Sequence, residues 1–493
     1  MTLPTTNQVR QTATGTLQVF AAEALGLATG LLTAAFLTRQ LGPELYGLFT
    51  VAATIVVWIE VSTILVLSRT TVKFVAEATD WKAVASTLAR AQLLLGLGSA
   101  ALLVVVAPAL AAWLKSAELS IYLRLFALDI PIFTLAHIHR SILAGRGAFG
   151  RRAILTAGRW LSRMVLIFLL VGLGLSVTGA ILASIGTSVV ELIVARVFVR
   201  PALLGRSALP IRHLGGYALP LFFCAVGMHL FNRLDLLVVK ALSGAPEAAG
   251  FYGAAQNLTI VPGLFAASFS PPLLATMTQL LGQGQDKTAR AMARQAMRLV
   301  LCLLPFAGVA AGAASEIVGL IYGRPFLPTG PLVALLIFSA LALTMISVTT
   351  TILTAAGRPG LTFALTGPLV PLALGAHLLL VPRFGPPGAA AATTALAWLG
   401  AGTTTLAVYR QCAITPAPAT ILRTTLTALI AYFLSSAWHT SGAWLVVKLA
   451  GITAVILTCL FLLGELTGQD LAFARSLLRR EQVRPPALSE QEL

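Results

Sequence analysis

Charged residues are scarce in this chain of 493 residues, where Asp, Glu, Lys and Arg together make up only 10%. Water-soluble domains usually carry about a quarter of their residues as charges, because a solvated surface needs them. The hydrophobic share is 57% and the mean hydropathy is +0.89. The composition therefore excludes a water-soluble globular protein.

Cysteines are few, and no Gly-Lys pair occurs anywhere in the sequence. The cysteines lie in or at the ends of apolar segments without metal-ligand spacing, so neither a disulfide framework nor a metal centre is expected. Without Gly-Lys there is no Walker A phosphate loop, so direct use of ATP is not expected. The net charge of +17 fits basic loops on one side of a membrane, and nucleic acid is not an expected partner.

Apolar stretches of about 20 residues recur along the whole chain, long enough to cross a bilayer as helices. They do not alternate with polar residues, which excludes a transmembrane barrel. The sequence predicts an all-α polytopic membrane protein with about 14 transmembrane helices, and a count of about twelve stays open. The expected segments lie at about 15–38, 45–68, 88–113, 121–144, 154–174, 177–199, 216–240, 249–272, 299–322, 329–355, 361–381, 388–410, 423–443 and 444–464.

Basic residues are distributed unevenly between the two ends of these segments. With the N-terminus inside, 26 Lys and Arg fall on the cytoplasmic side and 8 on the outer side. The positive-inside rule then places both termini in the cytoplasm. Residues 69–82 and 283–298 mix basic, acidic and apolar residues, which is typical of amphipathic elements lying on the inner leaflet.

Short motifs recur in the same order at nearly constant spacing. Pro43-Glu44 and Gly47 are repeated as Pro246-Glu247 and Gly250, an offset of 203. Ala-Arg at 89–90 recurs at 293–294, and Gly-Arg at 145–146 recurs at 357–358. The repeat unit is six helices, so the two halves have the same orientation in the membrane. Parallel repeats of this kind are typical of transporters that bind substrate between the halves and work by alternating access.

The repeat predicts the organisation of the chain. The expected parts are a cytoplasmic N-terminus at 1–14, an N-terminal six-helix half at 15–212, a C-terminal six-helix half at 213–412, two further helices at 413–466 and a cytoplasmic tail at 467–493.

Four segments resemble the bacterial polysaccharide-biosynthesis flippases. This is the O-antigen and polysaccharide branch of the superfamily that also holds multidrug and toxin extrusion proteins and lipid II flippases. The segments are TRQLGPELYGLF at 38–49, LPLF at 219–222, RLD at 233–235 and GFYGAA at 250–255. The resemblance implies translocation of an undecaprenyl-diphosphate-linked oligosaccharide from the inner to the outer leaflet of the cytoplasmic membrane of a bacterium or archaeon.

The resemblance also implies membrane lipids, a polysaccharide polymerase and glycosyltransferases as partners. Alternatives are a cation-coupled exporter of the multidrug and toxin extrusion type and a lipid II flippase. An enzyme is not expected, because the predicted outer loops are too short to carry a catalytic site. No cofactor is expected, and coupling to H⁺ or to Na⁺ stays open.

Ionisable residues at membrane depth are the candidates for the transport site, because they are costly in lipid and usually face a cavity or each other. Glu23, Glu60 and Glu191 are each expected roughly 12 Å from the inner surface, and Arg159 and Arg163 roughly 8 and 14 Å. We expect Arg159 and Arg163 to bind the lipid diphosphate, because arginine binds phosphate in a bidentate fashion. The glutamates would hold the arginines in the empty site or take up a coupling ion. In the alternative, Arg159 extends to the interface and the glutamates form structural pairs.

A second group of polar residues is expected in the outer half of the membrane. It consists of Asn232, Arg233 and Asp235, with Asp129 at a similar depth in another helix. Arg233 would bind the anionic headgroup there, or else form an ion pair that braces the halves. Arg39, at the outer interface, is interpreted as an anchor, with binding of substrate as the alternative.

Overall fold

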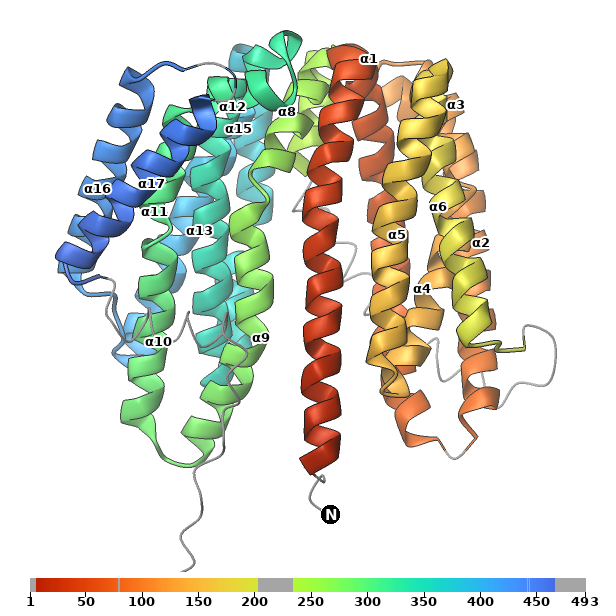
Figure 1. Cartoon of the computed structure of the whole chain (residues 1–493), viewed down its shortest axis with the longest axis horizontal. Coiled ribbons are helices and arrows are strands. Elements are labelled where there is room, and N and C mark those ends of the chain that lie inside the picture. The colour runs from red at the N-terminus through yellow and green to blue at the C-terminus, as the bar shows by residue number, and fades with distance from the viewer. Residues whose placement is uncertain (1–5, 79, 203–233, 441, 443, 466–493) are drawn as a thin grey trace, which may run out of the picture. The chain divides into compact units, whose positions relative to one another are not determined.

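The computed structural model describes residues 6–78, 80–202, 234–440, 442 and 444–465. Within these residues it contains helices and no strand, as Figure 1 shows. Nine helical segments of the described part are long and apolar enough to cross a membrane. These observations agree with the predicted all-α membrane protein.

The helices follow one another with short connections. Their bounds are α1 (Thr6–Glu77), α2 (Trp81–Trp113), α3 (Glu118–Phe126), α4 (Asp129–Gly145), α5 (Phe149–Leu170), a π-helical turn η1 (Val171–Leu175), α6 (Ser176–Phe198), an unlabelled helix over residues 234–243, α8 (Pro246–Leu258), α9 (Val261–Gly282), α10 (Asp286–Leu301), α11 (Leu304–Gly312), α12 (Ala314–Ile321), a 3₁₀ turn η2 (Arg324–Thr329), α13 (Gly330–Ala355), α14 (Pro359–Thr366), α15 (Leu369–Cys412), α16 (Pro418–Ala437) and α17 (Trp444–Leu462).

Glycines of positive φ divide the longest helical segments into two spans. Gly42 in α1 has a φ of 71°, Gly174 in η1 has 87° and Gly385 in α15 has 62°. This backbone region is open to glycine and strained for residues with a Cβ atom, so each glycine permits a break where the chain turns back. Every expected apolar segment except that at 216–240 therefore has a helical counterpart among the described residues.

Contacts divide the chain into two compact units. The first comprises Met1–Val261, Ile317–Ser339 and Ala364–Trp398, and the second comprises Pro262–Glu316, Ala340–Phe363 and Leu399–Leu493. The boundary expected between the six-helix halves, at 212/213, lies outside the described residues.

The repeated Pro-Glu motif makes a reciprocal contact inside the first unit. A Cβ atom added to Gly47 would overlap with the carbonyl oxygen of Pro246, and one added to Gly250 would overlap with that of Pro43. The ring of Phe326 packs edge-on beside this crossing, 5.7 Å from the ring of Tyr46. The two copies of the motif thus hold α1 and α8 together at a distance that only glycine permits.

The structure corrects the register of the repeat at the end of α4. Leu143 accepts a hydrogen bond from Ala148 N at 2.9 Å, and Leu353 accepts one from Arg358 N at the same distance. Gly147 and Gly357 have matching φ angles of 69° and 76°. These helix ends therefore correspond at an offset of 210. The offset of 212 that the Gly-Arg pairs indicated aligns the wrong residues, and Arg146 corresponds to Ala356.

The final helices, α16 and α17, pack closely onto α11 in the second unit. Gly308 and Gly312 are four residues apart, and a Cβ on either would overlap with a backbone oxygen of α16. Ser435 donates a hydrogen bond to the carbonyl oxygen of Val309 at 3.2 Å. Small residues at this spacing let membrane helices approach closely, where lipid offers no hydrophobic driving force.

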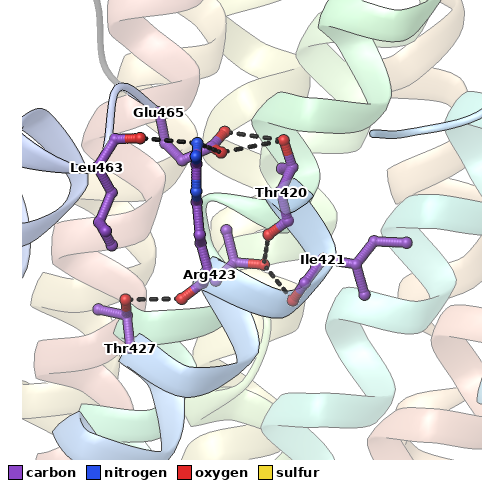
Figure 2. Close-up of polar contacts among 7 residues, drawn as sticks. Thr420, Ile421, Arg423, Thr427, Leu463 and Glu465 are labelled. Atoms are coloured by element: carbon purple, nitrogen blue, oxygen red, sulfur yellow. Dashed lines mark hydrogen bonds and ion pairs between the residues drawn. The ribbon is translucent and has the colours of Figure 1, made fainter. Parts of the chain in front are cut away.

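Ion pairs hold this helical hairpin at both ends. At one end Lys448, which is fully buried, contacts Glu316 at 2.7 Å. At the other end, shown in Figure 2, Arg423 donates to Leu463 O at 2.8 Å and to Glu465 at 3.2 Å. Thr420 also donates to the Glu465 carboxylate, at 3.0 Å. The hairpin is thus a fixed part of the second unit.

We predict that Gly47→Ala and Gly250→Ala lower the stability of the protein, because each added methyl group collides with backbone that cannot rotate away. Overpacking of this kind costs about 1–3 kcal/mol. The measurement is the midpoint of thermal unfolding of the purified protein in detergent. Gly98→Ala is the control, since its Cβ would meet nothing within 4 Å. Equal midpoints for all three variants would show that the crossing is looser than described.

Candidate functional site

A cluster of charged side chains lies inside the first unit, on helices α1, α4, α5 and α6. Arg159 and Arg163 are one helical turn apart in α5, so both guanidinium groups lie on the same face. Glu60 and Asp129 are each only 3% exposed, and Glu191 is 2% exposed. Ions so deeply buried require neighbours of opposite charge.

Glu191 provides that neutralisation for two arginines at once. Its Oε1 atom lies 2.8 Å from Arg140 Nε, and its Oε2 atom accepts a hydrogen bond from Arg159 Nη1 at 2.8 Å. The side chains of both arginines are 14% exposed, whereas that of Glu191 is inaccessible. Each arginine side chain therefore keeps a small accessible fraction, whereas the carboxylate has none.

The Arg159 guanidinium is held from a second direction by an aromatic ring. Its Cζ atom lies 4.2 Å from the centroid of Phe133, within the range of a cation–π interaction. The planar group is thus positioned between a carboxylate from α6 and an aromatic ring from α4. Arginine has further N–H donors beyond the one that Glu191 accepts.

Glu60, Asp129 and Arg163 form the incompletely satisfied part of the cluster. Glu60 interacts electrostatically with Asp129 and Arg163, and Arg163 with Asp129. Glu60 Oε1, Asp129 Oδ1 and Arg163 Nε are buried and have no hydrogen-bond partner among the described residues. Buried polar atoms are seldom left in this state, and where they are, a ligand, ion or water is a common reason.

The structure brings most of the predicted charge layer together. Four of the predicted residues lie together in this cluster: Arg159, Arg163, Glu60 and Glu191. Glu23 is exposed, and it interacts electrostatically with Arg140. Asp129, which the sequence grouped with the outer-half residues, interacts with Arg159 and Arg163 and so belongs to this cluster.

Arg140 is the member that the sequence reasoning missed, because it was counted among the cytoplasmic loop charges. One signal was present. Arg140 lies inside the segment expected at 121–144, and it follows Asp129 by eleven residues, which is about three helical turns. Both side chains therefore lie on the same face of one helix. That spacing could have placed Arg140 beside the other buried charges.

Asp235 lies in a separate hydrogen-bonded network in the first unit. Its carboxylate accepts hydrogen bonds from Tyr252 Oη at 2.8 Å and from Gln256 Nε2 at 3.0 Å. The Tyr252 hydroxyl also contacts Thr393, which contacts His377 Nε2 at 3.1 Å. Asn232 and Arg233, the other members expected of the outer group, lie outside the described residues.

Arg39 stabilises a helix end. Its Nε atom donates to the carbonyl oxygen of Ile321 at 3.1 Å, and Nη2 donates to that of Leu320. These are the last carbonyl groups of α12, which lack partners within their own helix. The contact joins α1 to the end of α12. Among the described residues, no group of three or more His, Cys, Asp or Glu is arranged to hold a metal ion.

Comparison with known proteins gives a consistent picture. A family model described as polysaccharide biosynthesis protein matches residues 14–279. None of the curated proteins matches the chain.

Among solved structures, the lipid II flippase MurJ in an inward-closed conformation has a TM-score of 0.72 at 16% identity, over 95% of this chain and 100% of that one. An inward-facing multidrug resistance transporter of the MATE family, in the MOP superfamily, has a TM-score of 0.59 at 14% identity, over 80% and 94% of the two chains. A MOP-superfamily transporter from Pyrococcus furiosus has 0.57 at 15% identity, over 83% and 99%. At these identities the likeness shows the fold, and the predicted all-α multi-pass membrane architecture is confirmed.

We predict that Glu191→Gln strongly destabilises the protein, because it leaves Arg140 and Arg159 buried without a counter-charge. Removing one partner of a buried ion pair typically costs about 3–5 kcal/mol. The measurement is the thermal midpoint in detergent, with Glu118→Gln as the control at an exposed position. Adding Arg140→Gln to Glu191→Gln should recover part of the loss. An unchanged midpoint for Glu191→Gln would contradict the proposed dependence of the cluster on this carboxylate.

Proposed function

Because the chain belongs to the polysaccharide biosynthesis protein family, whose model matches residues 14–279, we propose that it is a flippase for an undecaprenyl-diphosphate-linked oligosaccharide. It moves this lipid from the inner to the outer leaflet of the cytoplasmic membrane for the synthesis of cell-surface polysaccharide. Transport proceeds by alternating access between the two six-helix halves. The protein acts without an enzymatic step of its own.

The observation that carries this proposal is the buried arginine cluster. Arg140, Arg159 and Arg163 present three guanidinium groups within one helical bundle, and Glu191 holds two of them. A lipid-linked diphosphate is a dianion, and pairs of its oxygen atoms can accept hydrogen bonds from the two-pronged guanidinium group. A cationic drug has no use for these donors, which favours an anionic lipid headgroup as the substrate.

In this mechanism the carboxylate and the diphosphate compete for the same arginines. In the empty state Glu191 pairs with both Arg140 and Arg159, so that neither guanidinium group is buried without an acidic partner. The arriving diphosphate takes over donors of Arg159 and the unpartnered Nε atom of Arg163. Binding then exchanges one anion for another, so no arginine is left without a counter-charge at any step.

The two other buried carboxylates of the cluster provide a means of coupling. Glu60 and Asp129 lie close enough to interact, and each retains an unpartnered oxygen atom. A proton shared by the two, or a Na⁺ ion bound between them, would offset their mutual repulsion. Release of that ion on the other side of the membrane would return the cluster to its empty form.

Both termini are placed in the cytoplasm, on the strength of the 26 basic residues assigned to that side. Glycosyltransferases that build the lipid-linked oligosaccharide and a polymerase that consumes it are the partners that this role requires. A lipid II flippase is the second candidate, because the likeness to MurJ extends over 95% of this chain, against 80% for the MATE transporter. Lipid II also carries a diphosphate, so both candidates use the same arginines.

We predict that Arg163→Gln slows flipping about tenfold or more, because a charge-assisted hydrogen bond contributes roughly 1.5–3 kcal/mol. The assay follows a labelled undecaprenyl-diphosphate oligosaccharide in liposomes that contain the purified protein. An external sugar-modifying enzyme reports how much substrate has reached the accessible leaflet. Arg163→Lys keeps the charge without the planar fork and should fall between Gln and the wild type.

Arg151→Gln is the matched control, since Arg151 is an exposed arginine on the same helix. Lipid II, tested in parallel, distinguishes the two candidate substrates. Transport by the Arg163→Gln variant at the wild-type rate would remove the diphosphate role from this cluster. Failure of both lipids to move, together with ion-dependent export of a cationic dye, would replace the flippase by a drug exporter.

A further inference from the structure

A cavity of about 460 Å³ opens at one end of the second unit. The ends of α9, α10, α13 and α15 enclose it, at the side that the distribution of basic residues predicts to be cytoplasmic. Its apolar lining includes Met277, Leu281 and Ala289, and its polar lining includes Arg290, Asp286 and Gln411. The residues that line the cavity belong to the second unit, whereas those of the Glu191 cluster belong to the first.

The first half of the chain shows what fills the equivalent place. An offset of 204 aligns Ala85 with Ala289 and Ala89 with Ala293, and all four are buried. In the first half Trp81 and Arg146 lie against one another, with the guanidinium carbon 4.2 Å from the indole centroid.

Trp81 packs there against a hydrophobic cluster that includes Val75, Ala85, Ile142 and Leu143. Large side chains therefore close this end of the first half.

The second half lacks both members of that pair. The offset of 204 aligns Trp81 with Gln285, which is exposed, and the corrected offset of 210 aligns Arg146 with Ala356, which lines the cavity. An exposed glutamine and an alanine thus replace the tryptophan and the arginine, and the cavity lies beside that alanine.

Ser86 shows the same change. In the first half it accepts a hydrogen bond from the backbone of Ala202, which draws the following chain over the helix end. Its counterpart at an offset of 204 is Arg290, which lines the cavity instead. Where the first half has the hydrogen bond between Ala202 and Ser86, the second half therefore has an arginine that lines the open cavity.

Positive charge dominates the surroundings of the cavity. Arg290 and Arg358 both interact electrostatically with Cys412, which is itself part of the lining. Asp286 is the one acidic residue of the lining. An occupant of this cavity would thus meet an apolar floor and a mainly cationic rim.

We infer that this cavity binds the headgroup of an anionic phospholipid of the inner leaflet. The phosphodiester lies against Arg290 and Arg358, and the glycerol and first acyl carbons lie against Met277 and Leu281. Basic pockets between membrane helices on the cytoplasmic side are suited to such headgroups, because anionic lipid is concentrated there. The lipid takes the place that Trp81 and Arg146 occupy in the first half. This inference does not depend on the transported substrate.

Cys412 provides a direct reporter of occupancy. The full chain, with Cys224, Cys302 and Cys459 replaced by Ala, is purified in detergent and labelled with a water-soluble maleimide. Short-chain phosphatidylglycerol should slow the labelling of Cys412 by a factor that rises as 1 + [L]/Kd, about tenfold at nine times the Kd. Phosphatidylcholine and inorganic phosphate at the same concentrations should leave the rate within about twofold of the lipid-free value.

Matched variants test the two parts of the site. Arg290→Gln should abolish the protection by phosphatidylglycerol, whereas Arg294→Gln, one turn along α10 and outside the lining, should retain it. The double change Gln285→Trp with Ala356→Arg rebuilds the first-half pair and adds charge. It should slow labelling without lipid and make added phosphatidylglycerol ineffective. Thermal midpoints of all variants confirm that they are folded.

Three results would overturn the inference. Equal protection of Cys412 by phosphatidylcholine would show that any lipid covers the cavity and that the charge of the headgroup is not recognised. Protection by inorganic phosphate alone would identify a site for a soluble anion. Labelling that no lipid slows in the folded wild-type background would show that the cavity does not hold a headgroup.

Discussion

The carboxylate of Glu191 is the interaction on which the polar interior of the first unit depends. It lies between Arg140 of α4 and Arg159 of α5, at 2.8 Å from each, and it comes from a third helix, α6. Three helices therefore meet inside an apolar bundle at one carboxylate, which two guanidinium groups share as a counter-charge. Loss of that carboxylate would leave both guanidinium groups without this partner.

Comparison with the other buried ion pairs separates charges that hold helices together from charges that are available to a ligand. In the second unit Lys448 is paired with Glu316, and the carboxylate also accepts a hydrogen bond from the backbone of Thr440. Around Glu465 in Figure 2, Arg423 and Thr420 satisfy both carboxylate oxygens. Both groups fasten α16 and α17.

In the first unit, by contrast, Glu60, Asp129 and Arg163 each retain a buried atom without a hydrogen-bond partner among the described residues. A complete network stabilises one conformation, whereas an incomplete one can be completed by a bound group.

The sequence was sufficient to predict the helices, and insufficient to predict which charged side chains contact one another. Apolar segment length fixes where a helix crosses the membrane, and 1.5 Å per residue fixes how deep a side chain lies. These rules alone predict one layer of charges that contains Glu60, Glu191, Arg159 and Arg163.

Which of these side chains touch depends on how the helices rotate and pack, and that is decided by distant residues such as Gly47 and Gly250. The close packing of α16 on Gly308 and Gly312 is not predictable for this reason, whereas Arg140 could have been placed from its spacing to Asp129. The register of the repeat at α4 was corrected by backbone hydrogen bonds, which no sequence motif reveals.

The internal repeat also shows that its two copies have diverged in opposite directions. The two copies of the repeat are offset by 210 residues at Gly147, before α5, and by 211 residues at Gly174, after it. These offsets align Arg159 with Leu369 or Val370. They align Arg163 with Ala373 or Leu374. The offset of 211 aligns Glu191 with Gly402. The second copy thus has apolar residues where the first has its charge cluster, and it has an arginine-rimmed cavity where the first is closed by Trp81 and Arg146. A pair of identical halves would present the same groups twice. In the proposed mechanism, this divergence restricts the exchange of one buried anion for another to the first copy, and it leaves the second copy to contact lipid.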